Sequence, residues 1–226
     1  MHTHSHTHET PAQTEGRMIR WATWYDWLVN TLTLGHARML REMTVDQALL
    51  EPGEKVLDVG CGTGGVTIPA KQRVGKTGGA AGIDPAPEMI AVARKKAGRA
   101  GLEIDFRVGV IESLPFADGT FDVVTSSLMM HHLPFELQVK GLAEVYRVLK
   151  PGGRLLIADM FRLSASLHDR LFAVLTLHGG RVQRFGIQDL PELLKGAGFG
   201  EVKQLGARFL TIGFIRATKP VISIGH

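Results

Sequence analysis

One stretch constrains this chain more than any other: the residues from Val56 to Gly64, which read VLDVGCGTG. Val56, Leu57 and Val59 suit a buried strand of a parallel sheet. The glycines that follow let the backbone pass close to a ligand where any Cβ would intrude. The next residues predict a helix, whose free N–H groups point toward the same spot. The pattern therefore predicts a nucleotide-like ligand at this turn.

Two details of the turn disfavour a dinucleotide. The glycines are Gly60, Gly62 and Gly64, which is not the G-x-G-x-x-G spacing that admits a pyrophosphate. Asp58 stands just before them, and a carboxylate there repels a pyrophosphate but attracts an ammonium or sulfonium group. The chain also has no G-x-x-x-x-G-K-[ST] run, so phosphate cradling of the P-loop kind is unsupported.

At these residues the chain resembles the class I S-adenosylmethionine-dependent methyltransferases. Their first motif has the form hh[DE]hGxGxG, and the stretch from Asp58 to Gly64 fits it at every position. The resemblance extends from about Glu54 to Phe199 and looks strongest toward the ubiquinone/menaquinone C-methyltransferase-like branch, also called methyltransferase type 11. That branch also includes enzymes for phospholipids, sterols and small natural products.

The resemblance implies an α/β fold and a cofactor. The fold is a Rossmann-like, seven-stranded, mostly parallel sheet of order 3-2-1-4-5-7-6, with helices on both faces and an N-terminal helical lid. The cofactor is S-adenosylmethionine, and the activity is transfer of its methyl group to a small acceptor.

Other landmarks follow in the order that the resemblance implies. Ala80 to Asp84 predicts a second strand ending in a carboxylate, 20 residues past Gly64, which suits one crossover helix. Phe106 to Phe116 resembles the third strand and the loop that frames the adenine. Phe121 to Pro134 resembles the fourth strand and the loop that faces the transferred methyl. Val148 to Ile157 predicts the end of a helix, a Pro-Gly-Gly turn and the fifth strand.

The remaining part of the chain predicts two helices and a hairpin. The helices are expected at Ser166–Leu177 and Ile187–Lys195, with a glycine-rich turn at 179–180 between them. Strands are expected near Val202–Leu205 and Phe209–Arg216, and the second of these is expected to be antiparallel.

The resemblance also implies a set of cofactor contacts. Asp84 is expected to bind the ribose hydroxyls, while Met89 and Ile111 flank the adenine. Val110 stands where many relatives carry an acidic residue that accepts a hydrogen bond from the adenine, so this contact departs from the family pattern. The full expected set is Tyr25, Asp58, Gly60, Cys61, Gly62, Thr63, Gly64, Asp84, Pro85, Met89, Val110, Ile111, Glu112 and Ser127.

The candidates for a general base are His131 and His132, since they follow the fourth strand at the carboxyl edge where open α/β sheets bind ligands. Histidine titrates near neutral pH and can take a proton from a phenol or enol. The alternative is that one of the pair packs or caps the loop. His178 is a further candidate, with a helix-end role beside Gly179 as its alternative.

Composition agrees with one large domain. The chain has 226 residues, 44% of them hydrophobic, and a single cysteine, which excludes an intrachain disulfide. No apolar run reaches transmembrane length, so we expect a cytoplasmic protein, with peripheral membrane contact left open. The net charge is +4, but the main basic cluster, Arg94, Lys95, Lys96 and Arg99, favours a solvated helix face over a nucleic-acid site.

Four regions are expected along the chain. Residues 1–16 form a disordered, histidine-rich tail, for which incidental metal affinity is favoured over a dedicated metal site. Residues 17–50 form the helical lid, where Tyr25-Asp26 matches a pair in quinone methyltransferase relatives; docking onto the core is the alternative role of its aromatic residues. Residues 51–219 form the methyltransferase domain, and residues 220–226 a loose tail.

The acceptor is expected to be small and apolar, with C- or O-methylation unresolved and either a monomer or a homodimer open. Residues 128–130 and the helix at 171–175 are candidates for an apolar acceptor pocket or for ordinary core. Two alternatives from other classes stay open: a cofactor-binding protein without transferase activity, and a metal- or metalloid-handling methyltransferase. Cys61 argues against the latter, because it is the chain's single cysteine.

Overall fold

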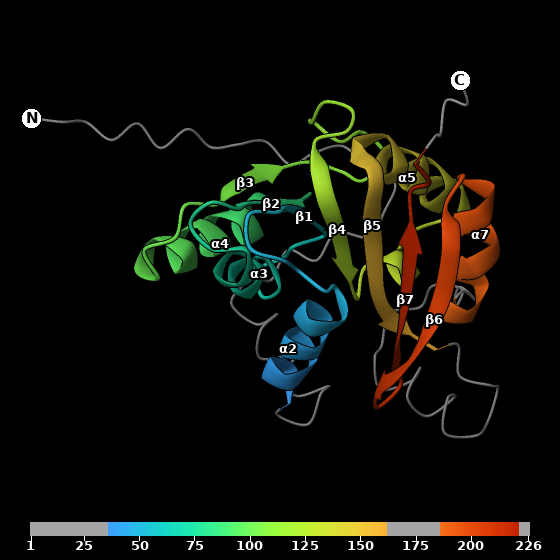
Figure 1. Ribbon diagram of the computed structural model, residues 1–226. Coiled ribbons are helices and arrows are strands. Elements are labelled where there is room, and N and C mark those ends of the chain that lie inside the picture. The colour runs from blue at the N-terminus through green and yellow to red at the C-terminus, as the bar shows by residue number, and fades with distance from the viewer. Residues whose placement is uncertain (1–35, 162–185, 222–226) are drawn as a thin grey trace, which may run out of the picture.

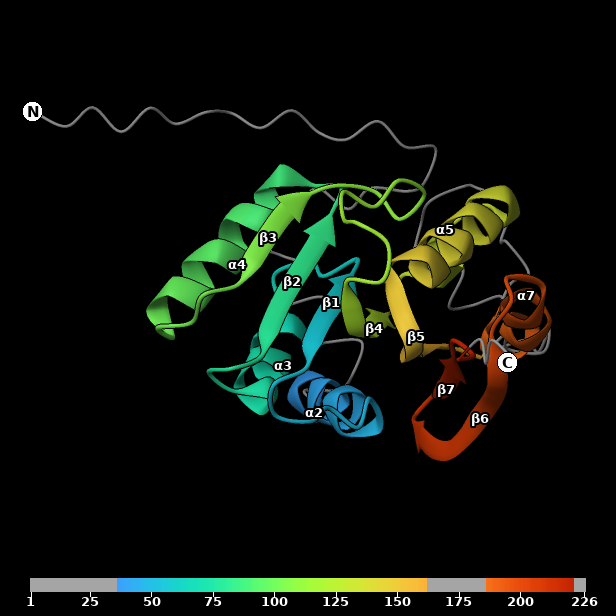
Figure 2. The same cartoon turned by 45° about the horizontal axis from the view of Figure 1, so that its top comes forward.

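The fold is organised by one seven-stranded sheet, which Figures 1 and 2 show from two directions. The computed structural model describes residues 36–161 and 186–221. The order of the strands is β3-β2-β1-β4-β5-β7-β6, which confirms the prediction. The strands are β1 (Lys55–Val59), β2 (Gly79–Asp84), β3 (Asp105–Val108), β4 (Phe121–Ser127), β5 (Leu149–Met160), β6 (Gly200–Phe209) and β7 (Ile212–Thr218).

The direction of the strands decides where a ligand can bind. The pairs β1–β2, β1–β4, β2–β3 and β4–β5 are parallel, and β7 is antiparallel to both of its neighbours. Loops that leave the parallel strands therefore gather at one edge of the sheet, on either side of β1 and β4. In open α/β sheets this carboxyl edge is where ligands bind.

Helices cover both faces of the sheet, and Figure 2 shows α4 and α5 on opposite sides of it. One face packs against α2, α3 and α4, and the other packs against α5 and α7. The helices are α2 (Ala37–Gln47), α3 (Thr67–Val74), α4 (Pro87–Arg99), α5 (Phe135–Val148) and α7 (Leu190–Gly196), with single 3-10 turns at η1 (Met130–His132) and η2 (Ile187–Asp189).

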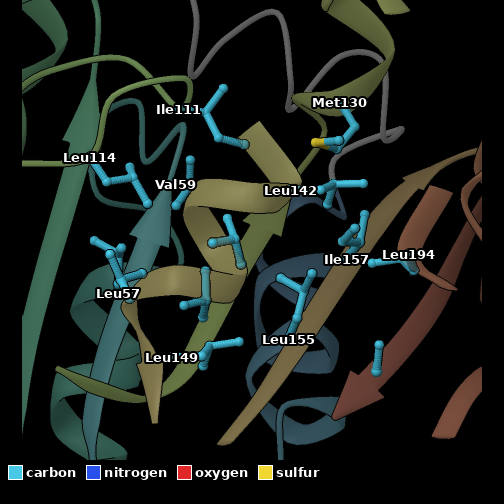
Figure 3. Close-up of a cluster of buried hydrophobic side chains, with 14 of the residues drawn as sticks. Leu57, Val59, Ile111, Leu114, Met130, Leu142, Leu149, Leu155, Ile157 and Leu194 are labelled. Atoms are coloured by element: carbon cyan, nitrogen blue, oxygen red, sulfur yellow. The ribbon is translucent and has the colours of Figure 1, made fainter. Parts of the chain in front are cut away.

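The core on the α5 side is built from alternate residues of the central strands. Leu57, Leu155 and Ile157 point to this face, and Leu142 of α5 packs onto them (Figure 3). Each is at most 1% exposed, and burying one such side chain contributes roughly 1.5–3 kcal/mol. Met130, in the loop that the sequence made a candidate for an acceptor pocket, is fully buried in this core.

The opposite face is closed by α2, whose end is held by two arginines of the sheet. Arg154 Nε donates to the carbonyl of Ala48 at 2.7 Å, and its Nη2 donates to the carbonyl of Leu49. The same guanidinium bonds both carboxylate oxygens of Glu54 at 2.8 Å. Arg216 donates to the carbonyl of Gln47 at 3.3 Å. Cations at a helix C-terminus satisfy its free carbonyls and favour its dipole, so α2 is fixed to the sheet at this end.

The predicted boundaries differ from the structure at two turns. The predicted seventh strand starts at Phe209, but Phe209 ends β6, and the chain turns at Leu210, which has φ of 52°. Leu210 is not a residue type that marks a hairpin turn, as an Asn-Gly pair would be, so the sequence pattern placed this turn too early. The Pro-Gly-Gly segment does not end a helix, because α5 already ends at Val148. It lies within β5, where Gly152 has φ of 79° and the register with β4 shifts.

Several predictions fall outside the described residues. These are the tail 1–16, the lid residues 17–35 with Tyr25, the helix Ser166–Leu177, the turn at 179–180, His178, and residues 222–226. The predicted helix Ile187–Lys195 is present as η2 followed by α7.

We expect Arg154→Met to lower the free energy of unfolding by about 2 kcal/mol. The substitution removes the hydrogen-bond donor to the carbonyls just after α2 and leaves Glu54 without its ion-pair partner, and both charged side chains of that pair are only 17% exposed. Urea unfolding followed by circular dichroism measures the loss. The matched control is Lys203→Met, which removes an exposed pair with Glu201 and should cost under about 0.5 kcal/mol. Equal effects of the two substitutions would contradict the role of Arg154 as a clamp.

Candidate functional site

The glycine-rich turn between β1 and α3 is folded back onto the end of β2. The amides of Gly60 and Cys61 both donate to the carbonyl of Ile83 at 2.9 Å. Gly60, Gly62 and Gly64 have φ of 74°, 50° and 80°, which other residues adopt only with strain. A Cβ on Gly60 would lie 2.5 Å from Cγ of Met129. The loop after β4 therefore packs directly on the turn.

Asp84, at the end of β2, ties the turn to the start of α4. Its Oδ2 accepts a hydrogen bond from the amide of Gly62 at 3.0 Å, and its Oδ1 accepts one from the amide of Ala86 at 3.0 Å. Burial raises the pKa of Asp84 above its ordinary value, although these two amides oppose the rise. The carboxylate therefore stands beside the turn, as the resemblance implies for a ribose-binding acid.

Asp58 joins three elements beneath the turn. Its Oδ2 accepts from the hydroxyl of Thr67 in α3 at 2.6 Å, and its Oδ1 accepts from the hydroxyl of Thr125 in β4 at 2.9 Å. Burial raises the pKa of Asp58 to about 6; the threonine hydrogen bonds oppose the rise, and the charge of Asp84 adds to it. Both carboxyls thus disfavour their own negative charge in the absence of a cation.

A cleft lies between α2 and this turn. It is lined by Arg41 of α2, Asp58, Gly60, Thr63, Gly65 and Ser127, together with apolar residues of which Leu128 is one. Five of the predicted cofactor contacts, which are Asp58, Gly60, Cys61, Thr63 and Ser127, therefore line one cavity. Leu128 has φ of 54°, a conformation that costs a leucine of order 1–3 kcal/mol and that often marks a functional site.

The other predicted contacts surround the turn at different depths. Met89 is 2% exposed beneath Ala86, and Ile111 is 5% exposed and packs against Gly141 of α5. Val110 is half-buried and bridges to Ser113, while Pro85 and Glu112 are half-buried. The side chains of Met89 and Ile111 therefore belong to hydrophobic clusters, and neither is among the residues that line the cleft. Tyr25 lies outside the described residues.

The basic cluster of α4 lies largely on a solvated helix face, as the sequence predicts, because three of its four residues are exposed. Lys96 donates to the hydroxyl of Thr63 in the glycine turn at 2.8 Å, and Arg94 donates to the carbonyl of Phe106 at 2.6 Å. Lys95 and Arg99 are exposed. Two of the four cations therefore brace the turn and β3.

The two candidate histidines differ in their partners. Nδ1 of His131 lies 2.5 Å from Oδ1 of Asp159, and the amide of His131 donates to Oδ2 of the same carboxylate at 3.2 Å. The Asp159 side chain is 3% exposed, and that of His131 is 19% exposed. The ring of His132 lies on the ring of His131, with centroids 3.9 Å apart. A carboxylate on Nδ1 fixes the ring and leaves Nε2 to act as a base.

Sequence reasoning missed Asp159, Arg41 and the two threonines that hold Asp58. Asp159 breaks the apolar run of β5 at the carboxyl edge, which is the same signal that identified Asp84 on β2. Arg41 had no such signal, because the sequence pattern of α2 does not indicate that this helix packs beside the glycine turn.

Comparison with known proteins decides the family. Residues 56–153 match a family described as the methyltransferase domain. A ubiquinone/menaquinone biosynthesis C-methyltransferase from Geotalea daltonii is 33% identical over 168 residues, which cover 71% of each chain. This chain belongs to the class I S-adenosylmethionine-dependent methyltransferase family.

Within that family the chain lies in the branch of the ubiquinone/menaquinone C-methyltransferases. A demethylmenaquinone methyltransferase from Thermus thermophilus is 39% identical over 135 residues, 60% of each chain. An arsenite methyltransferase from Halobacterium salinarum is 36% identical over 157 residues, 69% of this chain and 40% of that protein. The chain thus spans less than two thirds of either of these two relatives.

Solved structures agree on the methyltransferase fold. An S-adenosylmethionine-dependent methyltransferase from Aquifex aeolicus superposes with a TM-score of 0.64 at 24% identity, covering 79% of this chain and 89% of that one. Within residues 36–161 and 186–221, no three His, Cys, Asp or Glu side chains are grouped to hold a metal ion. None of the helices in these ranges is long and apolar enough to cross a membrane.

The raised pKa of Asp58 gives the family's first motif a testable pH dependence. Because the folded pKa, about 6, exceeds the ordinary value of 3.8, the contribution of Asp58 to stability is complete below pH 4 and is lost as pH rises through about 6. The loss at pH 7 is about 3 kcal/mol. Asp58→Asn should therefore melt above the wild type at pH 7.5 when no ligand is present, and the difference should shrink toward pH 5.

Differential scanning calorimetry of the two proteins at pH 5 and pH 7.5 measures this difference, in which the titration of Asp84 and other shared groups largely cancels. Asp118→Asn serves as the control, since that side chain is 80% exposed and should change little at either pH. At each pH the compared quantity is the melting temperature of Asp58→Asn minus that of the wild type. A smaller difference at pH 7.5 than at pH 5 would refute the raised pKa of Asp58.

Proposed function

We propose that this protein transfers the methyl group of S-adenosylmethionine to a small, apolar acceptor by direct in-line displacement. The observation that carries the proposal is a pair of carboxylates, the buried Asp58 and the half-buried Asp84, near the ends of adjacent parallel strands on either side of a glycine turn. In this arrangement Asp84 would hold ribose hydroxyls, and Asp58 would order the turn around a cationic ligand. Family membership supports the same assignment.

Positioning is the main task of the protein in such a reaction. When bound, the cofactor supplies an activated methyl group on a sulfonium. The glycine turn, Asp84 and the residues around the cleft would fix one reactant, and the loop after β4 would confine the other. Orientation of this kind lowers a barrier by roughly 7 to 11 kcal/mol.

The pairing of His131 with Asp159 favours an acceptor that must lose a proton. An imidazole whose Nδ1 faces a carboxylate is oriented to accept a proton at Nε2, and the acid stabilises the imidazolium that forms. We therefore assign His131 as the general base, Asp159 as its positioning residue, and His132 as a packing partner of the ring. A phenolic or enolic acceptor suits this base, and the quinone-methylating relatives support that class.

The arsenite-methylating relative suggests a second acceptor class, which the cysteine content opposes. Cys61 is the chain's single cysteine, and it is 6% exposed. Burial raises the pKa of the Cys61 thiol well above its ordinary value, and Asp58 and Asp84 raise it further. Thiolate binds soft metals and metalloids, so a thiol kept protonated is poorly suited to that role.

Transfer to an extract tests the proposed activity. The purified protein is incubated with methyl-labelled S-adenosylmethionine and an extract from its source, and the products are divided between organic solvent and water. Protein-dependent label in the organic phase is the expected result. Label confined to water would contradict an apolar acceptor, and cofactor binding without transfer to any extract would favour a non-catalytic binder.

His131→Asn and Asp159→Asn should each lower kcat by 10- to 1,000-fold at neutral pH, and the double variant should lose little more, because the two residues act as a unit. The rate on a phenolic acceptor measures this. The deficit should narrow above about pH 10, where a phenol ionises without help. His132→Asn, which leaves the His131–Asp159 pair intact, is the control and should keep most activity. A deficit equal at all pH values would indicate a structural role only.

A further inference from the structure

We infer that Arg208 of β6 binds a carboxylate on the acceptor, so that the acceptor carries this anionic group in addition to the hydroxyl that His131 would deprotonate. The inference rests on the proposed function, since it describes the same acceptor more closely. The body of the acceptor stays apolar, and one end of it is charged at neutral pH.

The register of the sheet places Arg208 in the same row as Asp159, the partner of the proposed base. Gly213 of β7 is opposite Asp159 of β5 on one side and opposite Arg208 of β6 on the other, and Figure 1 shows these three strands in succession. Opposed Cα atoms in antiparallel strands are about 5 Å apart, so Asp159 and Arg208 lie about 10 Å apart across Gly213. The row therefore has the base at one end and a cation at the other.

Alternation along the strands puts both ends of the row on the face that packs against α5. Ala207 and Phe209, the neighbours of Arg208, pack in the hydrophobic cluster on the α2 side, so Arg208 points to the opposite face. Ile157 packs in the cluster on the α5 side, and Asp159 follows it by two residues and shares its face.

The ring of Phe161 covers Gly213 and supports Arg208. A Cβ on Gly213 would lie 2.6 Å from Cζ and 2.7 Å from Cε2 of Phe161. Gly213 does not have positive φ, so the row needs glycine at this position for space. Cζ of Arg208 lies 4.7 Å from the centre of the same ring. Stacking on an aromatic face orients a guanidinium while its N–H donors stay available to a ligand.

A second stacked arginine shows what is unusual about Arg208. Arg107 lies over the ring of Phe116 at 4.8 Å, but its guanidinium also pairs with Asp105 at 2.7 Å. In the part of the chain that the structure describes, no carboxylate or carbonyl accepts a hydrogen bond from Arg208. Its charge is therefore available to an anion from outside the fold.

Asp159 is occupied by other donors. Its Oδ1 lies 2.5 Å from Nδ1 of His131 and accepts from the amide of Met160 at 2.7 Å, and its Oδ2 accepts from the amide of His131. The acid in the row of Arg208 thus serves the base. A carboxylate from a ligand suits Arg208, because the planar donors of a guanidinium match it in a bidentate pair.

An acceptor that spans the row would meet three different groups. Its hydroxyl would lie at His131, its apolar body beside Phe161, and its carboxylate at Arg208. A neutral acceptor would use the first two and leave the guanidinium without a partner. The row therefore favours an acidic phenol or enol over a neutral one.

Extraction at two pH values tests whether the acceptor is anionic. The purified protein is incubated with methyl-labelled S-adenosylmethionine and the source extract, and the products are extracted from water at about pH 2 and at about pH 8. A carboxyl group is neutral at the lower pH and charged at the higher, whereas a phenol is neutral at both. We expect protein-dependent label to enter the organic solvent at pH 2 and to stay in water at pH 8.

Variants then test whether Arg208 holds the carboxylate, with the acid-extractable fraction of the extract as the source of acceptor. Arg208→Met should lower the rate 10- to 100-fold when this fraction is dilute and less than threefold when it is saturating, because it removes binding that raises KM without changing kcat. Arg208→Lys should fall between Arg208→Met and the wild type. Lys203→Met, exposed on the same strand, is the matched control and should behave as the wild type does.

Titration with S-adenosylhomocysteine shows whether the cofactor site is intact, and all four proteins should bind it equally. Label in the organic solvent at both pH values would mean a neutral acceptor and would overturn the inference while the proposed function stands. Equal rates for Arg208→Met and the wild type would remove Arg208 from the site, and an equal loss at every dilution would make it a structural support. No transfer to any extract would refute the proposed function, and this subsite with it.

Discussion

The site depends on two carboxyls held beside one glycine turn, the buried Asp58 and the half-buried Asp84. Asp84 holds the turn to β2 through backbone amides, and Asp58 joins β1 to α3 and β4 through two threonine hydroxyls. Burial raises the pKa of both acids, and a cationic ligand beside them would stabilise their charged forms. The same residues thus shape the turn and select the sign of the ligand.

The sheet brings these groups together because its central strands are parallel. Asp58, Asp84 and Asp159 follow or end apolar runs on three strands, and all three lie toward the carboxyl edge. The faces of the sheet then divide the roles. Asp58 and Thr125 point toward the α2 side, whereas Asp159 and His131 lie over the α5 side. The cofactor contacts and the proposed base therefore approach the edge from opposite faces.

Much of the fold was predictable from sequence, because glycine spacing and apolar runs report local structure. The strand order is confirmed, and Asp58 and Asp84 lie in β1 and β2 on either side of the glycine turn. Two local details were wrong: Phe209 ends β6 and does not begin β7, and the Pro-Gly-Gly segment lies within β5 and does not stop a helix. Choosing between His131 and His132 was beyond the sequence, because only the register of β5 brings Asp159 to one of them. The approach of Arg41 to Gly65 was not predictable for the same reason, because it joins two elements that are separate in the sequence.

The most direct test of the central claim is ligand selectivity of the unmodified protein, measured as the shift in melting temperature with millimolar S-adenosylmethionine, NAD⁺ or ATP. A ligand that binds only the folded state raises stability by RT ln(1 + [L]/Kd), so a ligand bound at 1,000 times its Kd adds about 4 kcal/mol. The account predicts a clear rise with S-adenosylmethionine and none with the two phosphate-bearing nucleotides. A rise with NAD⁺ or ATP, and none with S-adenosylmethionine, would contradict it.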